Sequence, residues 1–426
     1  MLEEVVRDFD EWEPPPMVER ELRVPLNLGI RRAVSLIGPR RAGKTYYMFQ
    51  LIRRVRGRGR GVLYVNLEDY RLTGLDYRGL GELLEVFYEL HPEARSGAWL
   101  FLDEVQNVEG WERAVRTFID RGGVRVFLTG SSSKLLSSEL ATQLRGRTLA
   151  YEVFPFSFRE FLGARGFRAR WPFSSRERSR LLGLLREYVE WGGYPEAVLE
   201  PRVRAQVLRE IWEVTVTRDV VERWGVRNVK ALRLLVAALQ GSREFSAHRF
   251  YNYLRSLGLR VGKNTVYNYL EYLRDTLTVF LLHRYSPSYK RVEASIPKVY
   301  LVDDGLYGSK EWGRLFENTV FMELRRRGLR EDAELYYWRG HSGEVDFVAP
   351  REGLLVQATV ELGYDNERRE LRPLAKASRE LGAAKAYVIT WDQEGVYEVE
   401  GVRVEAVPLW KWLIGRAGPL QGRLPA

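Results

Sequence analysis

The sequence predicts an α/β protein that is built around a parallel β-sheet and continues into a second α/β unit. Three observations lead to this fold class. Between residues 30 and 150, short apolar stretches alternate with helical ones, and a glycine-rich segment follows the first of them. Residues 291–426 then mix strands with helices again. Because each helix returns the chain to the same edge of the sheet, this alternation predicts parallel strands with helices on both faces.

The elements of the first unit follow from local composition. Residues 1–22 are acidic and contain Pro14-Pro15-Pro16, which predicts an arm or linker. Beyond it, four apolar runs are each followed by turn residues or by a helix. They predict the strands of the sheet: Ala33–Ile37, Val62–Asn66, Ala98–Leu102 and Val124–Thr129.

Composition excludes several classes of protein. No apolar run approaches the roughly 18 residues that span a bilayer, and none resembles a signal peptide, so we expect a cytoplasmic protein without a membrane partner. The absence of cysteine excludes disulfides, cysteine–zinc sites and thiol nucleophiles. The net charge of +10 favours a polyanionic partner, although arginines on a solvated surface give the same value. An arginine-rich, cysteine-free composition is typical of a thermophilic source.

A phosphate-binding loop is the strongest signal in the sequence. Its glycines and its lysine have the required spacing, and it lies between a predicted strand and a helix that begins near Lys44. Backbone N–H groups and the helix N-terminus would bind the phosphates of ATP, Lys44 would reach the β- and γ-phosphates, and Thr45 would ligate Mg²⁺. The candidate nucleotide-binding residues are Gly38, Pro39, Arg40, Arg41, Ala42, Gly43, Lys44, Thr45 and Tyr46.

Two acids, Asp103 and Glu104, directly follow the third predicted strand, Ala98–Leu102. We expect Asp103 to hold Mg²⁺ together with Thr45, and Glu104 to orient and deprotonate the attacking water. A solvated turn would carry the same two carboxylates, but the phosphate loop upstream favours the catalytic interpretation.

Hydroxyl and basic residues after the fourth strand are further catalytic candidates. Thr129 or Ser131 would lie beside the γ-phosphate and sense its presence, unless this segment is a plain serine-rich turn. Arg145 and Arg147 are candidate arginine fingers that stabilise charge in the transition state of a neighbouring copy. The sequence does not distinguish between the two arginines, and a finger acting in trans would require a homo-oligomer.

These motifs together resemble one family, the archaeal and bacterial AAA+-type P-loop ATPases whose C-terminal domain of unknown function is similar to PD-(D/E)xK nucleases. The resemblance extends from about residue 20 to residue 400. It also suggests, through the Gly-x-Pro of related switch-type NTPases, that Pro195 packs against the adenine, although a commonplace turn has the same residues. The segments that carry the resemblance are Gly38–Thr45, Val65–Asp69, Leu102–Trp111, Thr129–Ser132 and Pro155–Phe161.

A winged-helix domain is predicted over residues 229–290, because three helices are followed there by a β segment. Its third helix begins at Lys263 and carries side chains of the kind that contact phosphates and base edges in duplex DNA. Alternatively, this helix packs inside the protein with Tyr267 and Tyr269 as core aromatics, and the domain binds a protein partner. The candidate DNA contacts are Lys263, Asn264, Thr265, Tyr267 and Asn268.

The C-terminal domain resembles a nuclease core that has lost part of its site. Glu317 and Asp346 stand where a helix acid and a strand acid would gather a metal ion. Gln357 begins the segment Gln-Ala-Thr where Glu-x-Lys is expected, so one metal ligand and the lysine are missing. Two oxygen ligands would still bind Mg²⁺ weakly. We therefore expect a restriction-endonuclease-like fold that is used for binding and has no nuclease activity.

The predicted organisation is thus an arm, an AAA+-like P-loop ATPase core with a parallel sheet, a helical lid, a winged-helix domain and a nuclease-like α/β domain. We expect a Mg²⁺-dependent, ATP-hydrolysing switch that acts on duplex DNA or on a protein partner. The alternatives are a nucleotide-controlled DNA-binding regulator with little turnover and an ATP-gated nuclease. The five predicted segments are 1–22, 23–153, 154–228, 229–290 and 291–426.

Overall fold

The computed structural model describes residues 1–56, 61–130, 144, 146–169, 171–331 and 333–422. The chain divides into two compact units, one that ends at Phe154 and one that begins at Pro155. Each unit is described by itself. Within the described residues, no helix combines the length and the apolar character needed to cross a bilayer.

The first unit is built on a five-stranded sheet in which every pairing is parallel and the strand order is β2-β3-β4-β1-β5. All residues of β1 and β3 are buried, as expected for central strands covered on both faces. The four predicted strands are confirmed to within one residue at each end, and an edge strand, β5, was not expected. The strands are β1 (Ala33–Ile37), β2 (Gly61–Asn66), β3 (Ala98–Asp103), β4 (Val124–Thr129) and β5 (Thr148–Glu152).

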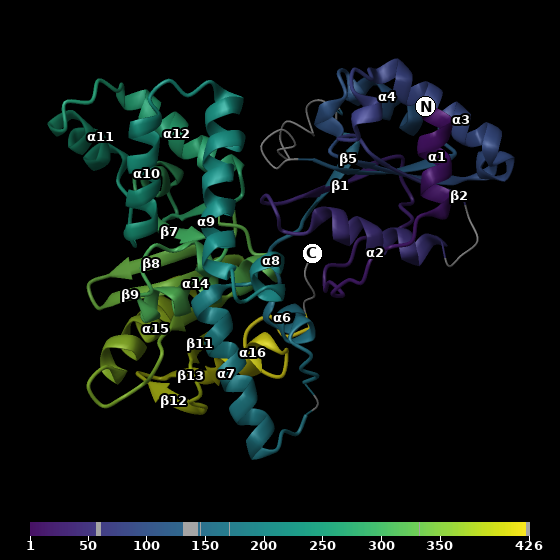
Figure 1. Cartoon of the computed structure of the whole chain (residues 1–426). Coiled ribbons are helices and arrows are strands. Elements are labelled where there is room, and N and C mark those ends of the chain that lie inside the picture. The colour runs from purple at the N-terminus through teal and green to yellow at the C-terminus, as the bar shows by residue number, and fades with distance from the viewer. Residues whose placement is uncertain (57–60, 131–143, 145, 170, 332, 423–426) are drawn as a thin grey trace. The chain divides into compact units, whose positions relative to one another are not determined.

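Helices cover both faces of this sheet, with α2 on one face and α3 and α4 on the other (Figure 1). Helix α1 lies in the predicted arm, where Val6 and Phe9 are buried as it packs against α3 and β2. The elements are α1 (Leu2–Glu11), α2 (Lys44–Arg56), α3 (Tyr77–Leu90), α4 (Trp111–Arg121) and three short 3₁₀ turns at Tyr70–Leu72, Pro92–Ser96 and Val105–Asn107.

The second unit opens with a group of helices whose ends are set by capping residues. Ser157 and Ser174 each form a reciprocal capping box, with Glu160 and Glu177, at the starts of α6 and α7. Gly192, in the left-handed region, ends α7. The group contains α6 (Phe158–Ala164), α7 (Ser175–Trp191), α8 (Pro195–Leu199), α9 (Arg204–Val214) and a π-helical segment, Thr215–Glu222.

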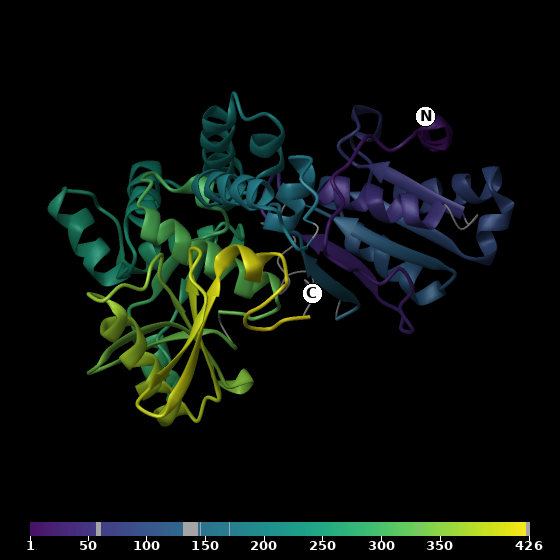
Figure 2. The same ribbon diagram turned by 90° about the horizontal axis from the view of Figure 1, so that it is seen from below.

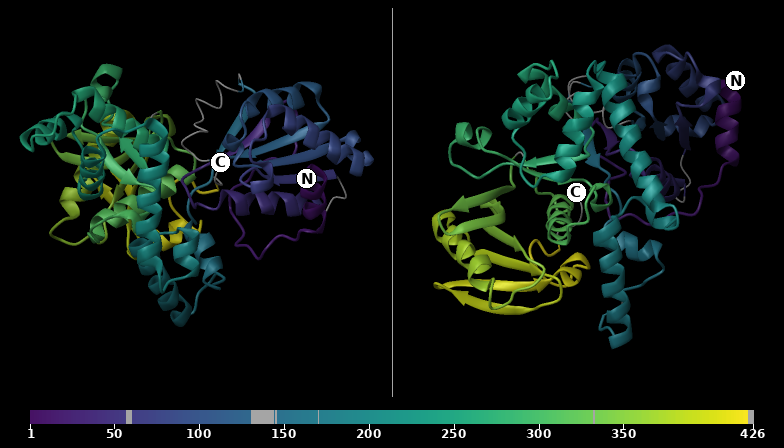
Figure 3. Two further views of the ribbon diagram at one scale, coloured as in Figure 1. Left: turned by 45° about the horizontal axis from the view of Figure 1, so that its top comes forward. Right: turned by 60° about the vertical axis from the view of Figure 1, so that its left-hand side comes forward.

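Three helices and a two-stranded antiparallel ribbon follow. The three predicted helices are confirmed, and the predicted β segment contains the first strand of the ribbon, which pairs with β7. In the right-hand view of Figure 3 these helices, in teal, lie above the strands of the C-terminal sheet. The elements are α10 (Val229–Gly241), α11 (Ala247–Ser256), α12 (Lys263–Asp275), β6 (Val279–Leu282), α13 (Tyr289–Glu293) and β7 (Lys298–Leu301).

The C-terminal part is a six-stranded mixed sheet of order β12-β13-β11-β10-β9-β8, whose last strands lie side by side in Figure 2. Its core lies between the sheet and α15, where Leu371 and Leu374 meet Val348, Leu355 and Val388. The elements are a 3₁₀ turn at Asp304–Leu306, α14 (Trp312–Arg326), β8 (Tyr336–Gly340), β9 (Gly343–Ala349), a 3₁₀ turn at Pro350–Glu352, β10 (Leu354–Ala358), α15 (Glu367–Leu381), β11 (Lys385–Thr390), β12 (Gly395–Val399), β13 (Val402–Pro408) and α16 (Leu409–Leu413).

Candidate nucleotide-binding site

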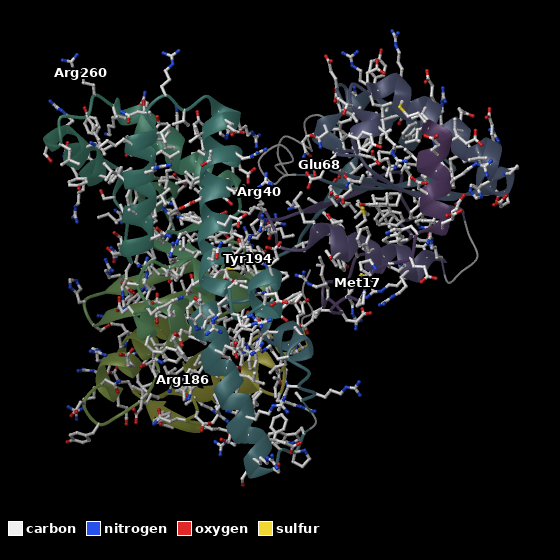
Figure 4. All side chains as sticks on the ribbon, in the orientation of Figure 1. Met17, Arg40, Glu68, Arg186, Tyr194 and Arg260 are labelled. Carbon is white, nitrogen blue, oxygen red and sulfur yellow. The ribbon has the colours of Figure 1, made fainter. Side chains whose placement is uncertain are left out.

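The predicted phosphate loop connects the buried strand β1 to α2. At its start, a Cβ atom on Gly38 would stand 2.1 Å from the carbonyl oxygen of Val153, so only glycine fits there. Arg41 and Gly43 have positive φ angles of 60° and 92°, which curl the loop before the helix begins. Figure 4 labels Arg40 in this loop and Glu68 in the segment after β2. The loop thus has the tight backbone that a phosphate cradle requires.

Lys44 is folded back onto the loop that it follows. Its side chain is buried, and Nζ donates hydrogen bonds of 3.0 Å to the carbonyl oxygens of both Gly38 and Pro39. These neutral acceptors hold the ammonium group at the loop, where the phosphates of a nucleotide would offer it charged acceptors instead.

Asp103 collects three hydroxyl groups at the end of β3. Thr129, at the end of the neighbouring strand β4, donates to Asp103 Oδ1, and Tyr64 donates to Oδ2 at 3.1 Å. The hydroxyl of Thr45 also bonds this carboxylate. Because β4 lies between β1 and β3, Thr129 stands between the loop strand and the acidic strand. The two predicted Mg²⁺ ligands, Thr45 and Asp103, are therefore in direct contact.

The chemistry of this donor set fits a hard divalent cation. Asp103 is 2% exposed, and burial raises its pKa; the nearby Glu104 raises it further, whereas the hydroxyl bonds oppose the shift. A carboxylate held in place but penalised for its charge gains from a cation beside it. Mg²⁺ prefers the carboxylate and hydroxyl oxygens that Asp103 and Thr45 offer.

Glu104 follows with a left-handed backbone, φ 55° and ψ 49°. Non-glycine residues in this region are uncommon, and they concentrate at functional sites. The conformation is held from both sides, since the backbone N–H of Glu104 donates to Thr129 Oγ1 at 3.1 Å and Gln106 donates to its carboxylate. Thr129 therefore braces Asp103 and Glu104 together, a contact that the sequence did not reveal.

Of the two predicted arginine fingers, the structure describes only Arg147. Arg145 lies outside the described residues, as does the candidate sensor Ser131. Arg147 precedes β5, where its carbonyl accepts the N–H of Ala33 at the first residue of β1. The phosphate loop follows the other end of β1, about 13 Å away at roughly 3.3 Å per residue. Arg147 pairs with Asp120 at 3.2 Å and lies at the end of β1 opposite to the phosphate loop, so its role as a finger stays a prediction.

Arg20, in the predicted arm, is a site residue that the sequence analysis missed. Its guanidinium donates to the carbonyl of Ala42 in the phosphate loop at 2.9 Å and also to the carbonyl of Phe154. Gln50 of α2 holds the same segment, because it accepts the N–H of Arg20 and donates to the carbonyl of Val18. No motif signals a single arginine near a proline run, so only the folded structure shows this contact.

Pro195, the candidate adenine contact, belongs to the second unit. It is the first residue of α8 and follows the buried Tyr194. The turn before it rests on Asp303, whose carboxylate accepts the N–H of Gly193 at 2.7 Å and that of Gly305 at 2.9 Å. A Cβ on Gly192 would lie 1.7 Å from this carboxylate. The role of Pro195 at the base stays a prediction.

The side chains predicted to contact DNA lie mostly on the outer face of α12. Lys263, Asn264, Tyr267 and Asn268 are exposed, and Thr265 is half-buried. Val266 and Leu270 of the same helix are buried, as is Tyr269, one of the two tyrosines that the alternative placed in the core. The exposed face is therefore available for contacts outside the chain.

Of the three residues in the predicted nuclease-like site, the structure brings two together. Glu317 of α14 and Asp346 of β9 both bind the ammonium group of Lys298. The side chain of Gln357 bonds the backbone N–H of Asp346 and the carboxylate of Glu370 instead. The sequence analysis missed Lys298, which precedes Glu317 and lies on another element.

Comparison with known proteins assigns the phosphate-loop unit to a recognised domain type. Residues 30–162 match the family described as AAA domain. Residues 182–311 and 312–412 match two families described as domains of unknown function, DUF8612 and DUF4143.

Two relatives match over most of their length. An uncharacterized protein of Methanocaldococcus jannaschii is 35% identical, and the match covers 97% of this chain and 95% of that protein. An uncharacterized protein of Haemophilus influenzae is 29% identical over 88% of this chain and 92% of its own. Among solved structures, the Walker-type ATPase of Pyrococcus abyssi aligns with a TM-score of 0.44 and 15% identity, covering 66% of this chain and 90% of that one.

Proposed function

We propose that this chain, which belongs to the family of AAA-domain proteins that includes its M. jannaschii relative, is a Mg²⁺-dependent ATPase that works as a molecular switch. The observation that carries the proposal is the cluster at Asp103. A buried carboxylate, the hydroxyl of Thr45 at the start of α2 and the brace of Thr129 converge beside a phosphate loop whose lysine is already in place. These groups are the ones needed to position a nucleoside triphosphate and the attacking water.

Each residue has a role that its contacts support. Lys44 exchanges its two carbonyl acceptors for phosphate oxygens and so holds the β- and γ-phosphates. Thr45 and Asp103 would hold Mg²⁺, which would neutralise charge on the phosphate oxygens. Glu104 accepts a proton from the attacking water, and its braced left-handed backbone fixes where its carboxylate points. Arg147 serves a neighbouring copy, because it lies at the end of the sheet opposite to the phosphate loop of its own chain and is too far from that loop.

Exchange of Glu104 for glutamine tests the hydrolytic role. Glu104→Gln keeps the shape of the side chain and removes the base, so we expect ATP binding to persist and turnover to fall roughly 100-fold or more. Lys44→Ala should lose ATP binding and serves as the blank. Glu82→Gln, on the exposed face of α3, is the matched control. Wild-type protein that binds ATP without hydrolysing it, with or without duplex DNA, would instead support a nucleotide-controlled regulator.

Duplex DNA is the second partner that we propose, through α12. Residues 229–290 contain ten Lys and Arg and three Asp and Glu, so this segment holds most of the chain's net charge of +10. Lys263 and Asn264 begin α12 on its exposed face, and Arg260, labelled in Figure 4, precedes them. Within the described residues, Arg260 and Lys263 have no acidic partner. Two basic side chains without an acidic partner, at and just before the start of α12, favour a polyanion over a neutral protein surface.

Salt dependence distinguishes this contact from general attraction. Lys263→Ala should weaken duplex binding similarly for all sequences and reduce the slope of log affinity against log salt by about 1. Lys385→Ala, at an exposed position of β11, is the matched control. An affinity that is the same in both variants would remove α12 from the DNA contact and would favour a protein partner.

A further inference from the structure

The second unit contains a buried ion cluster that neither proposed role uses. Lys298, the first residue of β7, places Nζ 3.0 Å from Glu317 Oε1, 2.6 Å from Glu344 Oε1 and 2.8 Å from Asp346 Oδ1. Lys298 is 6% exposed and Asp346 7%. The carboxylates come from α14 and β9, so a single ammonium group joins three elements that are distant in the sequence.

The charges of the cluster are organised around this lysine. Burial lowers the pKa of Lys298, but Asp346 and Glu317 outweigh burial and hold that pKa well above its ordinary value. Burial raises the pKa of Glu317, yet Lys298 and the hydroxyl of Tyr300 bring it below its ordinary value. Burial raises the pKa of Asp346 to about 7 in spite of the lysine. The three carboxylates thus share one ammonium group.

Two arginines also act on the cluster: Arg243 helps to lower the pKa of Glu317, and Arg339 bonds Glu344. Arg339 donates to the other oxygen of Glu344, Oε2, at 2.7 Å through Nε. Two further bonds reach the acids: Tyr300 donates to Glu317 Oε1 at 2.7 Å, and the N–H of Ala358 donates to Asp346 Oδ2 at 3.0 Å. Each of the two buried acids is thus held by at least one neutral donor besides the lysine.

The position of the ammonium group is the one that a metal would need. Glu317 and Asp346 are the two acids that a nuclease-like centre would use as ligands, and Nζ stands within hydrogen-bond distance of both. The amide of Gln357 faces Glu370 and the backbone of Asp346, so it adds no ligand. Among the described residues, no group of three or more His, Cys, Asp or Glu side chains is arranged to hold a metal ion.

We propose that Lys298 supplies the cation of this centre, takes the place of a divalent metal there and makes the centre a metal-free lock. The lock joins β7, the second strand of the ribbon after α12, to α14 and β9. It explains how a centre that has lost a ligand keeps two buried acids: the lysine satisfies them. It also fixes the β6–β7 ribbon, which follows helices α10–α12, to the C-terminal sheet in every nucleotide state of the ATPase.

Metal titration in a background without the nucleotide-site ligand tests the lock. In Asp103→Asn protein, we expect Mn²⁺ to leave the thermal midpoint unchanged. Adding Lys298→Ala should lower the midpoint by roughly 6–10 °C, because Glu317 and Asp346 are left buried without the ammonium group that bonds them both. Millimolar Mn²⁺ should recover part of that loss, whereas Lys385→Ala, a control on an exposed lysine, should change nothing.

Neutralising the acids separates charge from packing. Glu317→Gln with Asp346→Asn, combined with Lys298→Ala, should raise the midpoint above that of Lys298→Ala alone and abolish the response to Mn²⁺. The proposal is overturned if Asp103→Asn protein itself binds Mn²⁺ at a saturable site that Asp346→Asn removes, or if it cleaves DNA in a way that Asp346→Asn abolishes. This comparison needs no Lys298 variant, so it decides the matter even where Lys298→Ala does not fold.

Discussion

Asp303 should make the second unit less stable as the pH rises. Its carboxyl group is buried among Gly192, Gly193 and Gly305, and burial raises its pKa from 3.8 to about 6, although the two backbone N–H bonds oppose the shift. The folded protein therefore binds this proton more tightly than the unfolded chain does. The resulting stability is fully present below about pH 4 and is lost as the pH rises through 6.

The size of the effect follows from the shift. About two pKa units at 1.36 kcal/mol each give a loss of about 3 kcal/mol between pH 4 and pH 7. Asp303→Asn is neutral at every pH and lacks this loss, although one of its two N–H partners then faces an amide N–H and the variant starts from a lower stability. For a unit of this size, the thermal midpoint of the variant relative to that of the wild type should therefore rise by about 6 °C between pH 4 and pH 7.

Thermal unfolding of both proteins at pH 4.5 and pH 7.5, followed by circular dichroism, measures the difference. Asp365→Asn, at an exposed position, is the matched control and should run parallel to the wild type. A difference in thermal midpoint between Asp303→Asn and the wild type that is the same at both pH values would refute the reasoning. It would mean that Asp303 has the same pKa in the folded and unfolded chains.

Three further predictions concern the nucleotide site. Gly38→Ala should lose binding of a fluorescent ATP analogue more than tenfold, since its Cβ meets the Val153 carbonyl, while Gly29→Ala, with open space around it, should bind normally. Thr129→Val should lower kcat roughly 10- to 100-fold with little change in ATP affinity, and Thr129→Ser should restore turnover because it keeps the hydroxyl. Arg20→Ala should raise the KM for ATP roughly tenfold by freeing the loop carbonyl of Ala42, with Arg23→Ala as the exposed control; an equal effect of both would assign the change to general charge.

Sequence patterns predicted most of the first unit because its signals are local. The strands that end at Ile37 and at Asp103 are continuous apolar runs, and the phosphate loop has a fixed spacing between its glycines and Lys44. Strand β5 was missed because its residues are only half-buried at the edge of the sheet. Helix α1 was missed because its acidic composition predicted an arm or linker, although three of its apolar residues are buried.

The contacts that organise the second unit could not be predicted in this way. Lys298 reaches Glu317 and Asp346 across 19 and 48 residues, and the missing lysine was sought two residues after Gln357, on a different strand. In the first unit, Arg20 likewise bonds a carbonyl 134 residues away. Backbone carbonyls carry no sequence signature, and ion pairs between distant elements depend on the packing of the whole unit. Residue type alone therefore does not single out these side chains.

The segment that joins the two units is hydrogen-bonded on both sides of the boundary. On the side of the first unit, Val153 donates to the carbonyl of Ile37 at 2.7 Å and its own carbonyl touches Gly38, while Arg20 holds Phe154. On the side of the second unit, Arg326 donates to the carbonyls of Pro155 and Phe156, and the N–H of Phe156 donates to Gly193 at 2.7 Å.

Both sets of bonds act on consecutive residues of one short segment. They hold the chain on each side of the boundary between Phe154 and Pro155. In the second unit this segment bonds Gly193, in the turn that also rests on Asp303. The same buried carboxylate that makes the second unit sensitive to pH thus also holds the turn to which the joining segment is bonded.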